Sequence, residues 1–260
     1  MIKLTKISTR APKEADKKEY QEKTRKLAEE IAEYQHALYA EKKQALLVVF
    51  QGVDASGKDG ATKNVFGRCG TIGIDAYGFK KPTEEEFAHD FLWRVHKLAP
   101  AKGYIQVFNR SHYEDILIQS VHKWIDSKRV KVRMDAINAF ETLLAKDNNT
   151  VVLKFYMHIS KERQREKLQE RIDDPKSNWK HNSNDWEETK YWKEYRTAYE
   201  YAINSSTTPW HVVPVDQKWY RNYYIANIVR NTLKKMNPQL PILSEEDISI
   251  VEKIKSTERK

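Results

Sequence analysis

Residues 45–60 read ALLVVFQGVDASGKDG, and this stretch decides the expected fold. Its first part, ALLVVF, is a continuous apolar run of strand length, typical of a central strand that is covered on both faces of a parallel sheet. Its second part has the spacing GxxxxGK from Gly52 to Lys58, and a helical pattern follows. In such a frame backbone N–H groups surround an anion, the lysine reaches terminal phosphates, and the helix N-terminus adds its dipole. The stretch therefore predicts a phosphate-binding loop.

The loop contributes most of the candidate ligands. The alternative interpretation is a glycine-rich turn with an exposed lysine, which the number of matched features disfavours. We expect Lys58 to be catalytic. Contacts to phosphate or nucleotide are expected from the other loop positions, namely Gly52, Ala55, Ser56, Gly57, Asp59 and Gly60.

Two carboxylates make this loop unusual. Asp59 stands where such loops usually carry the Ser or Thr that binds Mg²⁺. Asp54 lies inside the loop, where a negative charge beside phosphates is unfavourable unless a cation lies between them. We therefore interpret Asp54 as a residue that organises Mg²⁺. For Asp59 a second interpretation stays open, because a carboxylate in the first turn of a helix is stabilised by the helix dipole.

Strand and helix patterns alternate along the rest of the chain. Further apolar runs of strand length are YIQVF (104–108), TVVLKFYMHI (150–159) and WHVVPV (210–215). Helical spacing covers 14–43, 84–98, 131–147, 161–172 and 186–204. Capping boxes are expected to open two of these helices, Thr83 with Glu86 and Asp185 with Glu188. This alternation predicts an α/β fold with a doubly wound, mostly parallel sheet flanked by helices.

Length and composition fit one domain over residues 1–260. No run approaches the roughly 18 apolar residues that a membrane span needs, and the N-terminus lacks the apolar region of a secretory signal. The single Cys69 excludes an intramolecular disulfide and suits the cytoplasm. The net charge of +9 favours a polyanionic partner. We expect a mobile polar loop over 173–185 and a flexible tail over 241–260.

The second predicted strand ends in a polar cluster. Asn109 stands where an ordinary ATPase has an aspartate, and Arg110 follows at once. Because ligands bind beyond the carboxyl ends of parallel strands, this cluster belongs to the predicted site. Arg110 can neutralise charge on a transferring phosphoryl group, although a surface arginine is the alternative. The carboxylates Glu114 and Asp115 come one helical turn later.

With these residues in place, the chain resembles the family 2 polyphosphate kinases, which are thymidylate-kinase-like P-loop enzymes. The resemblance runs from about residue 15 to 235 and rests on four ordered blocks. They are VFQGVDASGKDG (49–60), FKKPT (79–83), FNRSHYEDILI (108–118) and the stretch from RIDDP through WK to Asp185 (171–185).

The resemblance implies a P-loop kinase fold with a helical lid over 160–185. It implies transfer of the terminal phosphoryl group of inorganic polyphosphate to AMP and ADP, in either direction, with Mg²⁺ or Mn²⁺ as its substitute. By the same pattern Asp54 and Asp115 hold the metal, while Lys58 and Arg110 bind phosphates. By the same resemblance, a Glu at position 114 is typical of the third subclass of the family, which accepts both AMP and ADP. An Asn at this position is usual in the other subclasses. The further phosphate or nucleotide contacts that it implies are Lys80, Asn109, Arg171, Lys176 and Lys180.

Two other functions compete with this one. A nucleoside monophosphate kinase that uses ATP would share the fold, although Asp59 and Asn109 argue against it. A basic, nucleotide-regulated nucleic-acid-binding protein would explain the net charge, but no motif for it is present. We expect purine nucleotides, adenine above all, as partners, no specific nucleic acid, no membrane, and a homodimer or homotetramer. Aromatic residues over 179–201 are expected to be helix core, with a base-stacking platform as the alternative.

Overall fold

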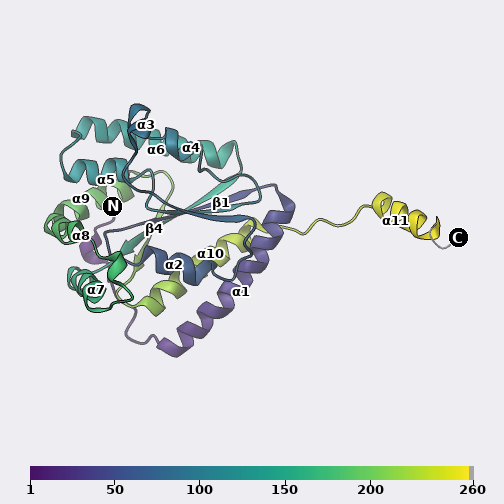
Figure 1. The fold of residues 1–260 in the computed structure, drawn as a ribbon, viewed down its shortest axis with the longest axis horizontal. Coiled ribbons are helices and arrows are strands. Elements are labelled where there is room, and N and C mark those ends of the chain that lie inside the picture. Colours follow the sequence, from purple (N-terminus) through teal and green to yellow (C-terminus); the bar gives the residue numbers. More distant parts are fainter. Residues whose placement is uncertain (258–260) are drawn as a thin grey trace.

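β1, Ala45–Gln51, is the central strand of the fold, and every one of its residues is buried. It pairs in parallel with β3 (Ile105–Asn109) on one side and with β4 (Thr150–His158) on the other. β2 (Ile74–Gly78) and β5 (Trp210–Pro214) complete a five-stranded sheet in the order β2-β3-β1-β4-β5 (Figure 1). All pairings are parallel, which confirms the predicted doubly wound α/β fold. This computed structural model describes residues 1–257.

The helices follow the strands in the expected alternation. They are α1 (Lys17–Glu41), α2 (Lys58–Phe66), α3 (Glu84–Ala88), α4 (Trp93–His96), α5 (Glu114–Val121), α6 (Ser127–Lys146), α7 (Lys161–Asp173), α8 (Ser183–Glu188), α9 (Trp192–Ser205), α10 (Lys218–Met236) and α11 (Glu245–Thr257). Short 3₁₀ helices cover η1 (Leu4–Lys6), η2 (Asn178–Lys180) and η3 (Thr189–Tyr191).

The alternation of side chains along β1 divides the core into two layers. Leu46, Val48 and Phe50 face the layer of α1, α2 and α10, whereas Leu47 and Val49 face the layer of α4, α5, α6 and α9. Figure 1 shows these two groups of helices on opposite sides of the sheet. Burial of each large aliphatic side chain contributes about 1.5–3 kcal/mol. A strand whose residues 45–50 are all apolar therefore needs a helix layer on both faces.

Three sequence predictions were wrong in detail. The edge strand β2 was missed, because its residues are mostly exposed and show no apolar alternation. The helix expected over 84–98 is two helices that break at His89–Leu92, although its capping box of Thr83 and Glu86 is confirmed. The helix expected over 186–204 starts earlier as α8, and the side chain of Asn182 caps it.

The C-terminal segment leaves the body of the protein after α10. Residues 238–244 run outward to α11, which stands away from the sheet and its helices in Figure 1. The flexible tail expected over 241–260 stays a prediction; the structure gives it a helix over Glu245–Thr257, and residues 258–260 lie outside the described residues. Within residues 1–257 the structure contains no helix that is both long and apolar enough to cross a membrane.

A buried ion pair joins β4 to α6 beneath the sheet. The Lys154 ammonium donates to Glu141 at 2.6 Å and to the Tyr113 hydroxyl at 2.6 Å. His112 lies 3.3 Å from the same carboxylate, and both Lys154 and Glu141 are fully buried. Burial by itself raises the pKa of Glu141, but the His112 hydrogen bond and the Lys154 charge outweigh it and hold that pKa below its ordinary value. Because Tyr113 directly precedes α5, this network anchors the start of that helix.

We predict that Lys154→Ala destabilises the protein by about 3–5 kcal/mol, because it leaves the Glu141 carboxylate buried without a cation. The double variant Lys154→Met/Glu141→Leu should recover most of that loss, since two apolar groups need no partner. Urea unfolding of the wild type and both variants measures the difference. A loss of less than about 1 kcal/mol in the single variant would contradict the role assigned to the pair.

Candidate active site

The candidate site lies at the carboxyl ends of two neighbouring strands. The loop of residues 52–57 follows β1, and Arg110 follows β3. Because β1 and β3 pair with Phe50 opposite Asn109, both segments leave the sheet at the same edge. The Arg110 backbone N–H donates to the Phe50 carbonyl at 2.9 Å, which ties the two segments together. The loop and the second-strand cluster, 50 residues apart in sequence, thus lie together at one edge of the sheet.

The loop needs glycine at Gly57 for two reasons. Its φ of +89° lies in the left-handed region, which favours glycine. A Cβ at this position would also overlap a guanidinium nitrogen of Arg221. Gly57 is the N-cap of α2, so the N-terminus of that helix opens onto the loop. Unpaired N–H groups at such a terminus attract anions, as a phosphate-binding loop requires.

Lys58 is almost completely buried and turns back onto its own loop. Its ammonium donates to the carbonyls of Gly52 at 2.8 Å and Val53 at 3.2 Å. A lysine has three N–H donors, so one remains for a ligand. Burial, followed by the nearby Arg110 charge, lowers the pKa of Lys58 to about 8. The lysine therefore reaches its titration range close to physiological pH.

Asp54 and Arg110 form the centre of the site. The Arg110 guanidinium pairs with Asp54 and also lies 3.4 Å from Glu114. Burial alone would raise the pKa of Asp54, but the charges of Arg110, Lys58 and Arg171 outweigh it and lower that pKa. The negative charge of Glu114 is the largest of the causes that raise the pKa of Arg110. Both side chains are therefore ionised, and Arg110 is held in the site rather than free on the surface.

The backbone is strained at both sides of this pair. Ala55 has a φ of 63° and Arg110 a φ of 61°, values that are uncommon for residues with a side chain. Such strain costs on the order of 1–3 kcal/mol per residue and clusters at functional sites. One strained residue, Arg110, belongs to the ion pair, and the other, Ala55, directly follows its partner Asp54, which supports a functional role for this part of the chain.

Asp115 does not join the Asp54–Arg110 pair. Its carboxylate lies 3.3 Å from the Arg94 guanidinium and accepts from the Gln119 amide at 2.8 Å. Burial raises the pKa of Asp115, although Arg94 and Arg133 partly offset the effect. Arg94 is itself buried, and its position on the short helix α4 gave no sequence signal.

The remaining loop and strand-end residues hold the site together. Asp59, in the first turn of α2, accepts a hydrogen bond from the Asn109 amide at the end of β3. The Lys180 ammonium lies 4.0 Å from the same carboxylate. Ser56 is buried, and its hydroxyl has no hydrogen-bond partner among the described residues. Asp59 therefore links the loop to the neighbouring strand, in addition to its place at a helix N-terminus.

α7 and the segment after it stand over the loop. Gln164 donates its side-chain amide to the Asp54 carbonyl at 3.1 Å. Arg171 donates to Asp185 at 2.5 Å, so Asp185 binds this arginine and does not cap a helix as predicted. Lys176 lies exposed on the turn before η2 and is not among the residues that line the cavities of this site in the described chain.

Two cavities meet at the Asp54–Arg110 pair. The first, of about 590 Å³, contains the loop together with Arg171, Lys180, Lys218 and Arg221. The second, of about 610 Å³, contains both Glu114 and Asp115 with the apolar side chains of Phe87, Ile118 and Trp124. Phe79 and Lys80 line both cavities, as Asp54 and Arg110 do. One cavity is thus basic and suits phosphates, and the other offers apolar and aromatic surface as well.

The aromatic residues over 179–201 divide between core and surface. Tyr199 is buried against Tyr156, whereas Trp179 is 79% exposed. Trp192 and Tyr195 line a small hollow beside Arg110, and the Tyr195 hydroxyl donates to Glu188 at 2.7 Å. An aromatic residue outside this range, Trp124, lines the second cavity and stacks against His122 with ring centroids 5.0 Å apart. Sequence reasoning missed Trp124, because a single exposed tryptophan carries no spacing signal.

The carboxylates of the site suit a magnesium ion. Asp54, Glu114 and Asp115 all line the second cavity. The described residues contain no cluster of three or more His, Cys, Asp or Glu side chains that could hold a metal by themselves. Mg²⁺ is usually bound by one or two carboxylates together with substrate phosphates, so the oxygen donors present fit it. In that arrangement the metal would bind along with its phosphate ligand.

Comparison with known proteins gives one consistent family. The family profile described as "Polyphosphate kinase 2 (PPK2)" matches residues 14–241. An "AMP/ADP-polyphosphate phosphotransferase" from Meiothermus ruber is 42% identical over 214 residues, which are 81% of this chain and 80% of that relative. An "ADP-polyphosphate phosphotransferase" from Rhodopseudomonas palustris is 36% identical over 240 residues, which are 86% and 83% of the two chains. A crystal structure of polyphosphate kinase 2 from Arthrobacter aurescens superposes with a TM-score of 0.91 at 34% identity and covers 96% of this chain and 93% of that one.

We predict that Gly57→Ala abolishes binding of inorganic tripolyphosphate without unfolding the protein. The new methyl group would overlap Arg221 and force a left-handed residue to carry a Cβ. Calorimetric titration measures the binding, and circular dichroism checks the fold. The matched control is Gly70→Ala, whose methyl group would meet its nearest neighbour at an ordinary 3.8 Å. Wild-type affinity in Gly57→Ala would contradict the proposed loop geometry.

Proposed function

The chain belongs to the polyphosphate kinase 2 family, and from this premise we propose that it transfers the terminal phosphoryl group of inorganic polyphosphate to AMP and ADP. The observation that carries the proposal is the meeting of two different cavities at one ion pair. A basic cavity over the phosphate-binding loop suits the polyanionic donor. A cavity with apolar and aromatic walls suits a nucleotide acceptor. Asp54 and Arg110 stand between them, where the phosphoryl group must pass.

The reaction itself needs no covalent chemistry from the protein. A terminal phosphate oxygen of AMP or ADP attacks the last phosphorus atom of polyphosphate, and the P–O–P bond behind it breaks. The nucleotide gains one phosphoryl group, and the donor leaves as a chain that is one phosphate shorter. The same steps run in reverse. Catalysis of such a transfer depends on positioning and on neutralisation of charge.

The side chains of the site supply both requirements. Arg110 is fixed by Asp54 and Glu114, so its charge is already oriented before the substrates arrive. Lys58 and the N-terminus of α2 bind the donor phosphates, while Lys80 lies where the two cavities join. Arg171 and Lys180 line the donor side from the segment over the loop. We propose that this segment, 160–185, closes over the phosphates and excludes water.

We also propose that Mg²⁺ takes part, with Mn²⁺ as its substitute. Asp54 would hold it on the donor side and Asp115 on the acceptor side, because both carboxylates line the acceptor cavity and Asp54 also lines the donor cavity. When bound, the ion neutralises phosphate charge in the transfer. Arg94 beside Asp115 partly offsets the rise in pKa that burial gives this carboxylate, which favours its ionised form.

Glu114 supports the assignment to AMP and ADP together. It lies in the first turn of α5, where its carboxylate pairs with Arg110 and lines the acceptor cavity. The family resemblance assigns a Glu at this position to the subclass that accepts both nucleotides. The printed name of the Meiothermus ruber relative includes both AMP and ADP. We therefore propose the same acceptor range for this chain.

Two rival functions are less well supported. An ATP-dependent nucleoside monophosphate kinase would use the same loop, but Asp59 and Asn109 stand where such enzymes usually carry a Ser or Thr and an Asp. A nucleic-acid-binding protein would not need an ion pair held by strained backbone beside the loop. We also propose a cytoplasmic location, because the single Cys69 allows no intramolecular disulfide and suits a reducing compartment. A homodimer or homotetramer stays a prediction from the family resemblance.

We predict that the purified protein with Mg²⁺ and polyphosphate converts AMP to ADP and then to ATP. The assay incubates AMP or ADP with either polyphosphate or ATP and separates the nucleotides by chromatography. Turnover of ADP alone would leave the donor assignment standing and contradict the role of Glu114. Turnover of AMP with ATP, together with no reaction of polyphosphate, would show an ordinary monophosphate kinase.

We predict that kcat/KM for polyphosphate falls as the pH rises through about 8. This ratio reports on the free enzyme, in which burial lowers the pKa of Lys58 to about 8. Below that pH the ammonium is protonated and binds phosphate, and above it the charge is lost. Phosphate groups are already ionised there, since their second pKa is about 6. Lys58→Arg keeps its charge at these pH values, so its residual activity should lack the fall; a fall of equal size in this variant would contradict the assignment.

A further inference from the structure

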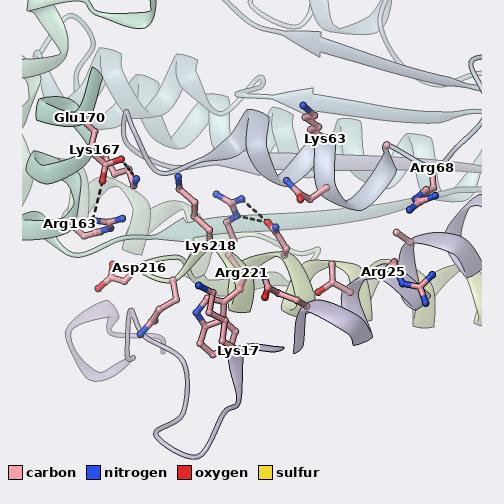
Figure 2. Close-up of a pocket in the computed structure, with 18 residues that line it drawn as sticks. Lys17, Arg25, Lys63, Arg68, Arg163, Lys167, Glu170, Asp216, Lys218 and Arg221 are labelled. Atoms are coloured by element: carbon pink, nitrogen blue, oxygen red, sulfur yellow. Dashed lines mark hydrogen bonds and ion pairs between the residues drawn. The ribbon is translucent and has the colours of Figure 1, made fainter. Parts of the chain in front are cut away.

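The central strand β1 ends in a buried polar residue. Gln51 is completely buried, whereas residues 45–50 before it are all apolar. By the alternation of side chains along the strand, Gln51 lies on the same face as Leu47 and Val49, towards α5 and α9. It therefore points away from the basic cavity between α1, α2, α7 and α10, which Figure 2 shows. A buried amide is costly unless its polar atoms have partners, so the partners of Gln51 indicate why it is there.

Three hydrogen bonds satisfy the Gln51 amide. Its oxygen accepts from the Ser111 hydroxyl at 2.9 Å and from the Ser111 backbone N–H at 3.0 Å. Its nitrogen donates to the Oε1 atom of Glu114 at 2.9 Å. The reverse orientation would turn the amide oxygen towards the carboxylate, and neither group could then donate to the other. The Ser111 hydroxyl also accepts from the Tyr113 backbone N–H at 3.2 Å, so the hydrogen bonds form one consistent series up to Glu114.

Glu114 is therefore held through both of its carboxylate oxygens. Its Oε1 atom accepts from Gln51, and its Oε2 atom lies 3.4 Å from the Arg110 guanidinium. Hydrogen bonds to a charged group are strong and restrict its direction. The Gln51 amide thus fixes the carboxylate that, together with Asp54, fixes the guanidinium.

Gln51 does not face the substrates itself. Within residues 1–257 it lines none of the cavities that contain Arg110. Glu114 and Arg110, by contrast, both line the acceptor cavity. The geometry therefore leaves one route by which Gln51 can act on an acceptor, which is the hydrogen bond to Glu114.

We propose that Gln51 is a positioning residue that allows the enzyme to use AMP as well as ADP. The inference rests on the proposed function, in which Glu114 underlies the use of both acceptors. ADP can contact the cations of the site through two phosphate groups, whereas AMP has only one. AMP therefore depends more strongly on the direction of the Arg110 guanidinium, and through it on the hydrogen bond from Gln51 to Glu114.

The test replaces Gln51 by methionine, an unbranched side chain that fills the same space without an amide. With polyphosphate as donor, we expect kcat/KM for AMP to fall about tenfold in Gln51→Met, which corresponds to ~1.4 kcal/mol. The value for ADP should stay within about threefold of the wild type. The ratio of the two values is the readout, because a loss of folded protein lowers both alike. Circular dichroism checks the fold of each variant.

Two comparisons separate positioning from packing. Gln106→Met makes the same replacement at a residue of β3 that is 7% exposed and lines none of these cavities in the described chain, so it should keep the wild-type ratio. The double variant Gln51→Met/Glu114→Ala is compared with Glu114→Ala alone. Because Gln51 acts through Glu114, its replacement should have no further effect once that carboxylate is absent, on whichever acceptor still reacts.

Each contrary outcome has a distinct meaning. If Gln51→Met leaves the AMP:ADP ratio unchanged, Gln51 serves only the packing of the strand end, and the inference is wrong. A further fall of more than about threefold on adding Gln51→Met to Glu114→Ala would show that Gln51 acts on another group, and would also overturn it. If the wild type turns over neither acceptor with polyphosphate, the proposed function fails and the inference falls with it. That failure is distinguishable, because the wild type alone reveals it.

Discussion

The pairing of β1 with β3 is the constraint on which the rest of the site depends. It places Phe50 opposite Asn109, so the loop after β1 and Arg110 after β3 leave the sheet side by side. The Asp54–Arg110 ion pair then closes the gap between them. Because both strands are buried in a two-layered core, neither segment can move away without breaking the sheet. A rigid β-sheet thus fixes charges that belong to distant parts of the chain.

The charged side chains around this pair differ in how easily they ionise, because their surroundings differ. Arg110 is held by two carboxylates and stays ionised, whereas burial makes Lys58 easy to deprotonate. Asp54 is kept ionised by cations, while burial raises the pKa of Asp115. A phosphoryl transfer needs such fixed charges on both sides of the moving group. In the proposed function, the ion pair lies between a basic donor cavity and an acceptor cavity with apolar and aromatic walls.

The folding stability and the site share one buried network. Lys154 and Glu141 lie under the start of α5, where Tyr113 leads directly to Glu114 and Asp115. Removal of one partner would leave a charge in the core and also release the helix end that carries the acceptor-side carboxylates. The buried ion pair thus helps to position the carboxylates of α5, although neither Lys154 nor Glu141 lines a cavity of the site.

Much of the fold and of the candidate site was predictable from the sequence, because local sequence patterns encode them. An apolar run followed by GxxxxGK specifies a strand, a loop and a helix within 20 residues, and Asn109 and Arg110 follow the second strand directly. Prediction from the sequence failed where no local pattern exists. Examples are the polar edge strand β2, the break in the helix expected over 84–98 and the capping expected from Asp185.

The sequence by itself thus determined the fold class, the phosphate-binding loop and the residues that follow the strand ends, since neighbours in the chain encode them. Only the tertiary structure decided which charges meet. Arg221 lies over 160 positions from Gly57, yet its guanidinium fills the space beside that glycine. Arg94 likewise reaches Asp115 from another helix. The physical reason is that three-dimensional packing decides whether a charged side chain finds a partner. The spacing of residues along the chain does not encode that packing.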